Sequence, residues 1–343
     1  MKLFAANCKV VRGQQRACLI DLQHQELRLI PLILADFLEE KCTYETLDNL
    51  SKKMLLELKS LEMVLDIENN ERDFFPDIPL EFDTPYAISN AILDYNSSSH
   101  YNLIDALKAL ESVRCPHIEI RFYDIFNIDL LHEIGAALFD SIIDSIDLYI
   151  PYSAELSYDE LEQLKINNIR FRWMFIHSVP DNYSYHKTYP FLKHTTEKIA
   201  DQSHCGVVHY FYFELHISVF TESQHHNTCL NRKISIDTQG RIKNCPSMQQ
   251  FFGHIYDTSL EDVISNPAFT KVWNIKKDEI EKCKGCEFRH ICTDCRAYLE
   301  HPEDLYSAPL KCGYNPKTCE WEDWSTNPLK EKSIQYYNLQ PTS

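Results

Sequence analysis

Apolar and polar residues alternate at the start of the chain, and the spacing of apolar positions then lengthens to that of a helix. Alternation with a period of two predicts strands, whereas apolar positions three and four residues apart predict helices. Polar residues at positions 12–15 supply a turn between the first two strands, and Thr43 stands where a helix N-cap is expected. The expected strands are residues 3–11, 17–21 and 26–30, and the expected helices are residues 32–40, 45–52 and 55–64. This order of strands and helices indicates a small winged-helix module.

A proline-rich stretch separates this module from a longer region in which strand and helix patterns alternate. Residues 71–100 contain Pro76, Pro79, Pro85 and the run NSSS at 96–99, which indicate a linker that leads into a strand. The expected strands beyond it are residues 117–123, 145–150, 170–176 and 206–213, and the expected helices are residues 130–139, 158–166 and 190–201. Repeated units of this length predict a parallel sheet or a partial β/α barrel.

The last part of the chain begins with a hairpin pattern. Residues 233–236 and 241–243 flank the polar turn DTQG, and a helical pattern follows near residues 260–264. We therefore expect an α/β protein built from three domains. The expected domains are residues 1–75, 76–224 and 225–343.

The composition narrows the classes of protein to which this chain can belong. Its net charge of −17 argues against binding to nucleic acid or to an anionic membrane, and no apolar run approaches the length of about eighteen residues that a membrane span requires. The first residues, MKLFAANCKVVRG, lack the apolar core of a secretory signal, so we expect a cytoplasmic protein. The chain has only seven glycines and contains neither GxxxxGK[ST] nor GxGxxG, which argues against the usual nucleotide-binding loops.

Eight of the thirteen cysteines fall in the last third of the chain. Eight thiolates complete two four-cysteine sites with none left over, and in a reducing cytoplasm clustered cysteines more often hold metal than form disulfides. Such sites suit iron–sulfur clusters and tetrahedral zinc alike, so two [4Fe-4S] clusters and two Zn²⁺ ions both remain open at this point. The expected metal ligands are Cys229, Cys245, Cys283, Cys286, Cys292, Cys295, Cys312 and Cys319.

The order of these cysteines, C-x10-G-x4-C, a gap, C-x2-C-x5-C-x2-C, a gap and a late cysteine, resembles a SPASM domain. SPASM domains are the cluster-binding C-terminal extensions of peptide-modifying radical SAM enzymes. The segments KISIDTQGRIKNCPSM and CEFRHICTDCRAYLEHPEDLYSAPLKCGYNPKTCEWEDW are similar to the SPASM-domain peptide maturases of grasp-with-spasm systems, which accompany an ATP-grasp peptide ligase. In one departure, two residues, Thr293 and Asp294, separate the last close pair, where the family usually has three.

The chain departs from radical SAM enzymes at both parts of the SAM site. Those enzymes hold a cluster on CxxxCxxC just after the first barrel strand, near residues 85–104 here, but no cysteine lies between Cys42 and Cys115. The GGE turn that should follow the next strand is also missing, because IEIRFY runs into Asp124. We therefore expect a degenerate radical-SAM-like barrel that does not bind SAM or start a radical reaction by the usual route.

The resemblance also implies how the cysteines divide between two [4Fe-4S] clusters. Ligands that come wholly from the protein leave no position for a substrate, so both clusters would be structural or electron-conducting. One cluster would take Cys283, Cys286 and Cys292 with Cys312 or Cys319, and the other would take Cys229, Cys245 and Cys295 with the remaining late cysteine.

The N-terminal module resembles the PqqD-like domains that recognise leader peptides. The resemblance rests on VRG, CLIDL and LRLI, followed by a short helix. In that family the leader adds a strand beside the third strand through main-chain hydrogen bonds. An ordinary winged-helix lid would have the same pattern. The implied peptide-binding residues are Gln25, Glu26, Leu27, Arg28, Leu29 and Ile30.

These observations lead to an accessory protein of a ribosomal peptide pathway. It would bind a precursor peptide and act with an ATP-grasp peptide ligase. Two alternatives stay open: an iron–sulfur redox or atypical radical SAM enzyme, and a zinc-stabilised regulatory protein. His204 and Cys205 are a further candidate pair, because an adjacent base can activate a thiol, although fifteen histidines make such proximity common. Glu119 and Asp124 are either the lining of a remnant cavity or solvated carboxylates.

Overall fold

The computed structural model describes residues 3–4, 7–124, 126–181 and 189–339. The chain forms two compact units, each assembled from separate stretches of sequence. The first unit comprises Met1–Asp83, Val207–Cys229 and Asn274–Ser343, and the second comprises Thr84–Gly206 and Leu230–Trp273. The expected division at residues 75 and 224 stays a prediction.

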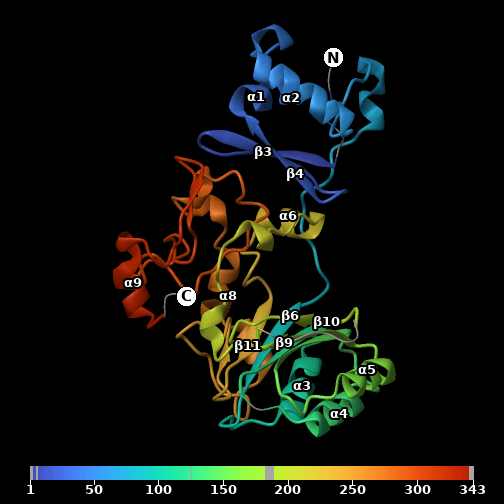
Figure 1. The fold of residues 1–343 in the computed structure, drawn as a ribbon, viewed down its shortest axis with the longest axis vertical. Coiled ribbons are helices and arrows are strands. Elements are labelled where there is room, and N and C mark those ends of the chain that lie inside the picture. Colours follow the sequence, from blue (N-terminus) through green and yellow to red (C-terminus); the bar gives the residue numbers. More distant parts are fainter. Residues whose placement is uncertain (1–2, 5–6, 125, 182–188, 340–343) are drawn as a thin grey trace. The chain divides into compact units, whose positions relative to one another are not determined.

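The N-terminal part of the first unit is a three-stranded antiparallel sheet with β3 in the middle. Its strands are β2 (Cys8–Arg12), β3 (Arg16–Asp21) and β4 (Glu26–Pro31), and its helices are α1 (Leu32–Leu38) and α2 (Asn49–Ser60). Both helices lie on one side of the sheet (Figure 1). Ala17 and Leu19 of β3 belong to the core on that side, and Cys18 and Ile20 belong to a second core on the other side. Burial on both sides explains why β3 is a nearly continuous apolar run.

The rest of the first unit has little regular secondary structure. A two-residue ladder joins β1 (Leu3–Phe4) to β5 (Val64–Leu65), and another joins β13 (Tyr314–Asn315) to β14 (Glu320–Trp321). The remaining α-helices are α6 (Ile217–Ser223) and α9 (Glu331–Tyr336). Short 3₁₀-helices occur at Tyr44–Thr46, Asn69–Phe74, Tyr210–Tyr212, Lys277–Glu279, Cys283–Gly285 and Pro328–Lys330.

The second unit is built on a seven-stranded sheet in the order β10-β9-β8-β7-β6-β11-β12. Every neighbouring pair is parallel except β11 with β12, which form the expected hairpin. The strands are β6 (Asn90–Tyr95), β7 (His117–Phe122), β8 (Ser145–Pro151), β9 (Phe171–His177), β10 (Leu192–His194), β11 (Lys233–Ile236) and β12 (Ile242–Lys243). The expected α/β class with a parallel sheet is confirmed.

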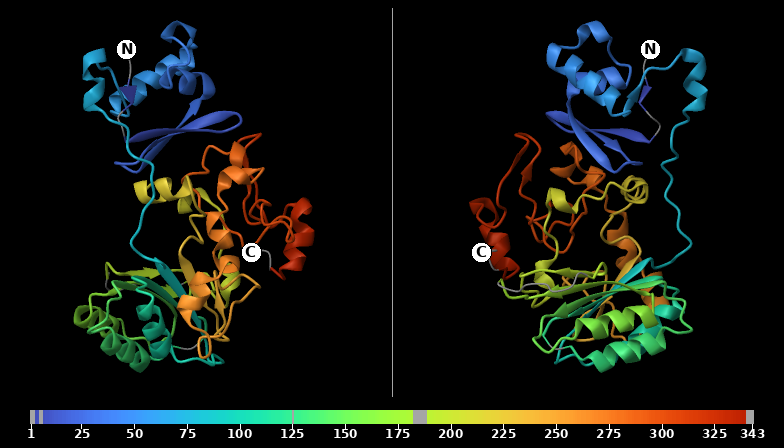
Figure 2. Two further views of the ribbon diagram at one scale, coloured as in Figure 1. Left: turned by 180° about the vertical axis from the view of Figure 1, so that it is seen from behind. Right: turned by 45° about the vertical axis from the view of Figure 1, so that its right-hand side comes forward.

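Three helices connect the consecutive parallel strands and lie on the same face of the sheet, as both views of Figure 2 show. They are α3 (Leu103–Ser112), α4 (Ile128–Ala137) and α5 (Tyr158–Asn167), and each begins after an Asn or Ser whose side chain accepts a backbone N–H. Such caps satisfy amide groups that the first helical turn leaves unpaired. Two shorter helices, α7 (Leu260–Ser265) and α8 (Pro267–Thr270), follow the hairpin, and 3₁₀ turns occur at Gln202–His204 and Lys271–Asn274.

Two of the secondary-structure predictions for the middle of the chain are wrong. The helix expected at residues 190–201 is instead the edge strand β10, because backbone hydrogen bonds from Met174 to Phe191 and from Thr195 to Ile176 hold this segment extended beside β9. The strand expected at residues 206–213 is a single bridge at Val208 followed by a 3₁₀ turn. The aromatic residues of this turn are exposed, with Phe211 at 76%.

The helices of the N-terminal module also differ from expectation. Residues 45–52 and 55–64 were expected as separate helices, but one helix, α2, runs through Asn49–Ser60. Its N-cap is Asp48, which accepts the Ser51 N–H at 2.7 Å, whereas Thr43 precedes only a 3₁₀ turn and makes no side-chain cap. No helix in the described part of the chain has the length and apolar character to cross a bilayer.

Candidate metal centre

Four of the predicted ligands line a single cavity in the first unit. Cys283 is the first residue of a 3₁₀ turn, Cys286 directly follows that turn, and Cys292 lies six residues further along the chain. Cys312 lies in a loop just before β13. The other walls are apolar side chains, including Phe213, Phe288 and Trp321, and the basic side chains Lys277, Lys282 and Arg289. The four thiols are the donor set that iron–sulfur clusters and structural zinc share.

Short backbone turns place the three closely spaced cysteines on this cavity. The Cys286 N–H donates to the Cys283 carbonyl at 2.9 Å, and the Cys292 N–H donates to the Phe288 carbonyl at 3.0 Å. The Phe288 N–H also lies 3.4 Å from the Cys286 sulfur. Backbone N–H groups that face a sulfur stabilise its thiolate form, which is the form that binds metal.

Burial acts in the opposite direction and favours the protonated form of these thiols. It raises the pKa of Cys283 to about 12, and it raises the pKa of Cys286 and Cys292 as well. A buried thiolate needs a compensating positive charge, which a bound metal supplies as it displaces the protons. Lys277 offsets part of the effect of burial at Cys283 and Cys292, and a bound metal would supply further positive charge.

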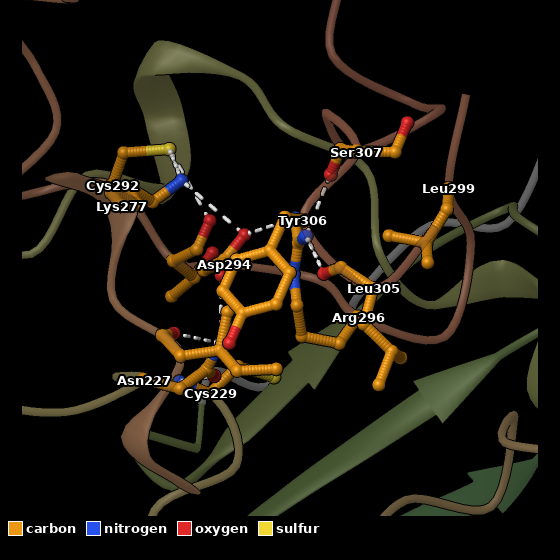
Figure 3. Close-up of polar contacts among 12 residues, drawn as sticks. Asn227, Cys229, Lys277, Cys292, Asp294, Arg296, Leu299, Leu305, Tyr306 and Ser307 are labelled. Carbon is orange, nitrogen blue, oxygen red and sulfur yellow. Dashed lines mark hydrogen bonds and ion pairs between the residues drawn. The ribbon is translucent and has the colours of Figure 1, made fainter. Parts of the chain in front are cut away.

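A buried lysine lies against one of the four thiols. Lys277 is 7% exposed, and its Nζ is 3.3 Å from the Cys292 sulfur and 3.9 Å from Asp294 Oδ1 (Figure 3). Burial lowers the pKa of this lysine, but the nearby Cys292 and other anionic groups outweigh burial, so the net shift is upward. Lys277 thus places a positive charge and an N–H donor at a predicted metal ligand.

Asp294 and Asn227 continue this network towards a second pair of predicted ligands. Asp294, which is 1% exposed, accepts from Asn227 Nδ2 at 2.7 Å and from Arg296 Nη2 at 2.6 Å. Asn227 Oδ1 in turn accepts the Cys229 backbone N–H at 3.0 Å. Figure 3 shows this run of polar contacts from Cys292 to Cys229. Buried polar contacts of this kind fix the orientation of the ligands that they touch.

Cys295 lies near Cys229 within this second group. Burial first, and then the neighbouring Cys229, raise the pKa of Cys295 to about 11. Cys245 belongs to the other compact unit, where it follows β12. Cys319 packs against the same apolar cluster as Cys286 and Cys312 but is not among the residues that line the cavity. Within the described residues, no group of three or more Cys, His, Asp and Glu side chains is placed to hold a metal ion.

Sequence reasoning missed the polar residues around the cysteines. Lys277 lies in the charged run KKDE, which has the composition of a solvated surface segment. Asn227 follows two histidines and carries no motif of its own. The position of Asp294 between Cys292 and Cys295 was the one available signal, since a residue between two ligands cannot lie far from either.

The predicted peptide-binding residues lie at an edge of the three-stranded sheet. In the described part of the chain β4 pairs with β3 alone, so its outer side is not covered by another strand. Glu26 is exposed, Leu27 and Leu29 pack against the apolar cluster of the first unit, and Ile30 is buried. Gln25 precedes the strand with a positive φ of 58° and lies 3.5 Å from the ring nitrogen of His216.

Comparison with known proteins identifies the cysteine-rich segment. Residues 228–287 match the SPASM family, an iron–sulfur cluster-binding domain. The SPASM match contains Cys229, Cys245, Cys283 and Cys286 and ends before the other predicted ligands. No curated protein matches the sequence.

Two crystal structures of Streptococcus suis SuiB are similar in structure to this chain. SuiB bound to its precursor peptide SuiA has 11% sequence identity and a TM-score of 0.30, and the match covers 90% of this chain and 99% of SuiB. SuiB bound to S-adenosylmethionine has 12% identity and a TM-score of 0.27, and the match covers 87% of this chain and 96% of that one.

Proposed function

We propose that this chain is an accessory peptide-maturation protein of a ribosomal peptide pathway in the cytoplasm. It binds a precursor peptide, acts with an ATP-grasp peptide ligase and carries two [4Fe-4S] clusters. The observation that carries this proposal is the cavity lined by Cys283, Cys286, Cys292 and Cys312, the first two of which lie at the end of the SPASM match. That match favours iron–sulfur clusters over zinc for the same set of thiols.

In our proposal the clusters stabilise a region that has little regular secondary structure. The part of the first unit that surrounds the cavity consists of loops, single 3₁₀ turns and two-residue strands. Metal ligation supplies folding free energy to such a region because the site does not exist in the unfolded chain. When bound, a [4Fe-4S] cluster can also exchange an electron.

The second unit fits a degenerate radical-SAM-like barrel. Strands β6 to β10 follow one another in sequence order across the sheet, and the helices between them lie on one face, which is the winding of a partial β/α barrel. The sequence between Cys42 and Cys115 contains no cysteine for a SAM-binding cluster. In our proposal this unit has lost radical chemistry, and the bond in the peptide is formed by the ligase.

Peptide recognition is assigned to the outer side of β4. An edge strand presents unpaired N–H and C=O groups to which an extended peptide can add as a further strand. Residues 25–30 provide this edge, with Arg28 and Glu26 as exposed charged groups beside it. The leader of the precursor would occupy this position.

Metal analysis tests the cofactor assignment. Protein purified and reconstituted without oxygen should contain about eight iron and about eight acid-labile sulfide per chain. About two zinc ions per chain and no sulfide would overturn the cluster assignment and favour a zinc-stabilised protein. SAM-dependent turnover of the precursor by the isolated chain would favour the alternative of an atypical radical SAM enzyme.

Hydrogen–deuterium exchange tests the assignment of the peptide. The probe is the precursor peptide encoded beside this chain, added in excess to the metallated protein. The outward-facing amides among residues 26–30 should exchange more slowly with peptide present, because added-strand hydrogen bonds protect them. The central strand β3 serves as the internal control, since its amides already pair on both sides. Unchanged exchange at all of residues 26–30 would contradict this assignment.

A further inference from the structure

The second unit contains a cluster of ionisable groups that the proposed function does not use. It is centred on Cys205, which follows the 3₁₀ turn Gln202–His204 and is half-buried. The Cys205 sulfur lies 2.9 Å from Nη1 of Arg121 and 3.5 Å from Nε2 of His204. A cation and an imidazole therefore face the same sulfur atom.

Arg121 is buried and paired with a carboxylate, and one of its guanidinium N–H groups makes no hydrogen bond to a described residue. This residue of β7 is 1% exposed, and its Nε donates to Asp94 Oδ1 of β6 at 2.7 Å. Its Nη2 is buried and makes no hydrogen bond to any described residue. A buried guanidinium N–H without a partner is rare, and an oxygen atom of a bound molecule would satisfy it. Because Nη1 of the same planar group contacts Cys205, this donor stands beside the thiol.

His204 is oriented to act as a base towards Cys205. Its Nδ1 lies 2.7 Å from the Asp201 carbonyl oxygen, which can only accept a hydrogen bond, so Nδ1 carries the proton. In the neutral ring, Nε2 then has a lone pair, and this is the nitrogen that faces the sulfur. A thiol, a base and a third group that orients the base form the arrangement of an activated cysteine nucleophile.

The charges around the thiol favour its ionised form. Burial raises the pKa of Cys205, but Arg121 and His204 outweigh burial and lower it overall, while Glu119 opposes them. Burial lowers the pKa of His204, but its contact with Cys205 outweighs that effect and raises it. Cys115 of the same unit shows the effect of burial without a cation, since burial raises the pKa of its thiol to about 12. These neighbouring charges favour a thiolate at Cys205 beside a protonated His204.

We propose that Cys205 is a nucleophilic thiolate that accepts an acyl group from an activated acyl donor, with His204 as its proton acceptor and Arg121 as the donor to the carbonyl oxygen. The sulfur lone pair forms a bond to the carbonyl carbon, and charge develops on the oxygen beside Nη2 of Arg121. The bond from carbon to the leaving group then breaks. The leaving group departs with its electron pair and takes the proton that His204 holds, and a thioester remains on Cys205.

Alkylation tests the thiolate. The full metallated chain is treated with limiting iodoacetamide between pH 5.5 and 9, and the adduct on each cysteine is measured by mass spectrometry. Cys205 should react with a midpoint below the value near 8.5 of an ordinary thiol. The H204Q variant should move that midpoint upward, while a C42S variant should leave it unchanged. A midpoint near 8.5, or no adduct on Cys205, would overturn the proposal.

Acylation tests the substrate class. The probe is p-nitrophenyl acetate, an activated ester whose leaving group is coloured. The wild-type chain should release about one equivalent of p-nitrophenolate in a burst and gain one acetyl group on Cys205, which hydroxylamine removes. C205S should lose the burst while keeping its iron content and circular dichroism. Alkylation at low pH without such a burst, or a burst that C205S retains, would overturn the assignment of an acyl substrate.

Discussion

The Nζ of Lys277 lies 3.3 Å from the sulfur of Cys292, and both residues are less than 10% exposed. A lysine is seldom buried unless anionic groups compensate its charge. Here the compensating groups are the predicted cluster ligands and Asp294. This contact links the charge of the proposed cluster at the cavity to a single side chain, which can be replaced without changing a predicted ligand.

Replacing Lys277 by Met should lower the reduction potential of the cluster at this cavity. The substitution removes a positive charge and a hydrogen bond to sulfur, and both favour the reduced, more negative cluster. We expect a shift of at least about 60 mV to more negative potential, which is a tenfold change in the one-electron equilibrium. A redox titration followed by electron paramagnetic resonance measures it.

The matched control for this variant is Lys284→Met. Lys284 is close in sequence but exposed, with its ammonium paired to Glu281. The Lys284→Met variant should leave the reduction potential unchanged. Equal potentials in the wild type and the Lys277→Met variant, with iron content intact, would contradict a cluster beside Lys277. Arg296 still pairs with Asp294 in that variant, so the buried carboxylate keeps a cation.

Double substitutions can decide which late cysteine shares a cluster with Cys283. Cys312 lines the same cavity as Cys283, whereas Cys319 does not. Each single Cys→Ser variant should therefore lose one cluster and retain about four of about eight iron atoms. The pair Cys283→Ser with Cys312→Ser should also retain about four, because both changes remove the same cluster.

The contrasting pair is Cys283→Ser with Cys319→Ser, which should retain almost no iron because it removes one ligand from each cluster. Iron and sulfide analysis on anaerobically reconstituted protein reads out both pairs. The reverse pattern would assign Cys319 to the cavity in place of Cys312. Cys42→Ser, in the N-terminal module, should keep the full iron content.

The sequence predicted those parts of the fold that depend on local pattern. Strands β7 and β8 and the hairpin of β11 and β12 appear where period and turn residues indicate them. The edge strand β10 was missed because its extended form depends on hydrogen bonds to β9, which local propensity does not encode. Cysteine spacing likewise indicated a metal site, but the buried position of Lys277 arises from segments brought together by folding. The sequence of a charged run is the same whether its side chains are exposed to solvent or buried against thiols.

Arg16 and Glu287 provide a test of such a long-range contact. They are 271 residues apart in sequence, and the Arg16 Nε lies 2.6 Å from Oε1 of Glu287, whose side chain is fully buried. Arg16→Met would leave that carboxylate buried without its cation, at a cost of about 3 kcal/mol in the free energy of unfolding. Urea denaturation followed by fluorescence measures this change.

Arg28→Met is the matched control for that experiment, because Arg28 pairs with Glu26 at the surface of the same sheet. An exposed pair contributes at most about 1 kcal/mol. If the two variants lost equal stability, the contact between Arg16 and Glu287 would not stabilise the fold.

His177 should make the second unit sensitive to mild acid. It is 1% exposed, and its Nε2 donates to the Phe122 carbonyl at 2.9 Å. Burial lowers the pKa of His177, and the hydrogen bond only partly offsets this. In the unfolded chain its pKa is about 6.5, so below that pH the unfolded state binds a proton that the folded state resists. The neutral ring therefore makes its full contribution to the free energy of unfolding above about pH 6.5. This contribution is lost as the pH falls towards the lower pKa of the folded state.

Measurement of urea unfolding at pH 7.5 and pH 5 tests this prediction. His177→Gln keeps a donor for the Phe122 carbonyl but cannot titrate, so its free energy of unfolding should fall less between the two pH values than that of the wild type. The difference should be about 1.4 kcal/mol for each unit by which folding lowers the pKa. His100→Gln, at an exposed position, corrects for the loss of a histidine as such. Parallel falls in all three proteins would show that His177 does not resist protonation in the folded chain.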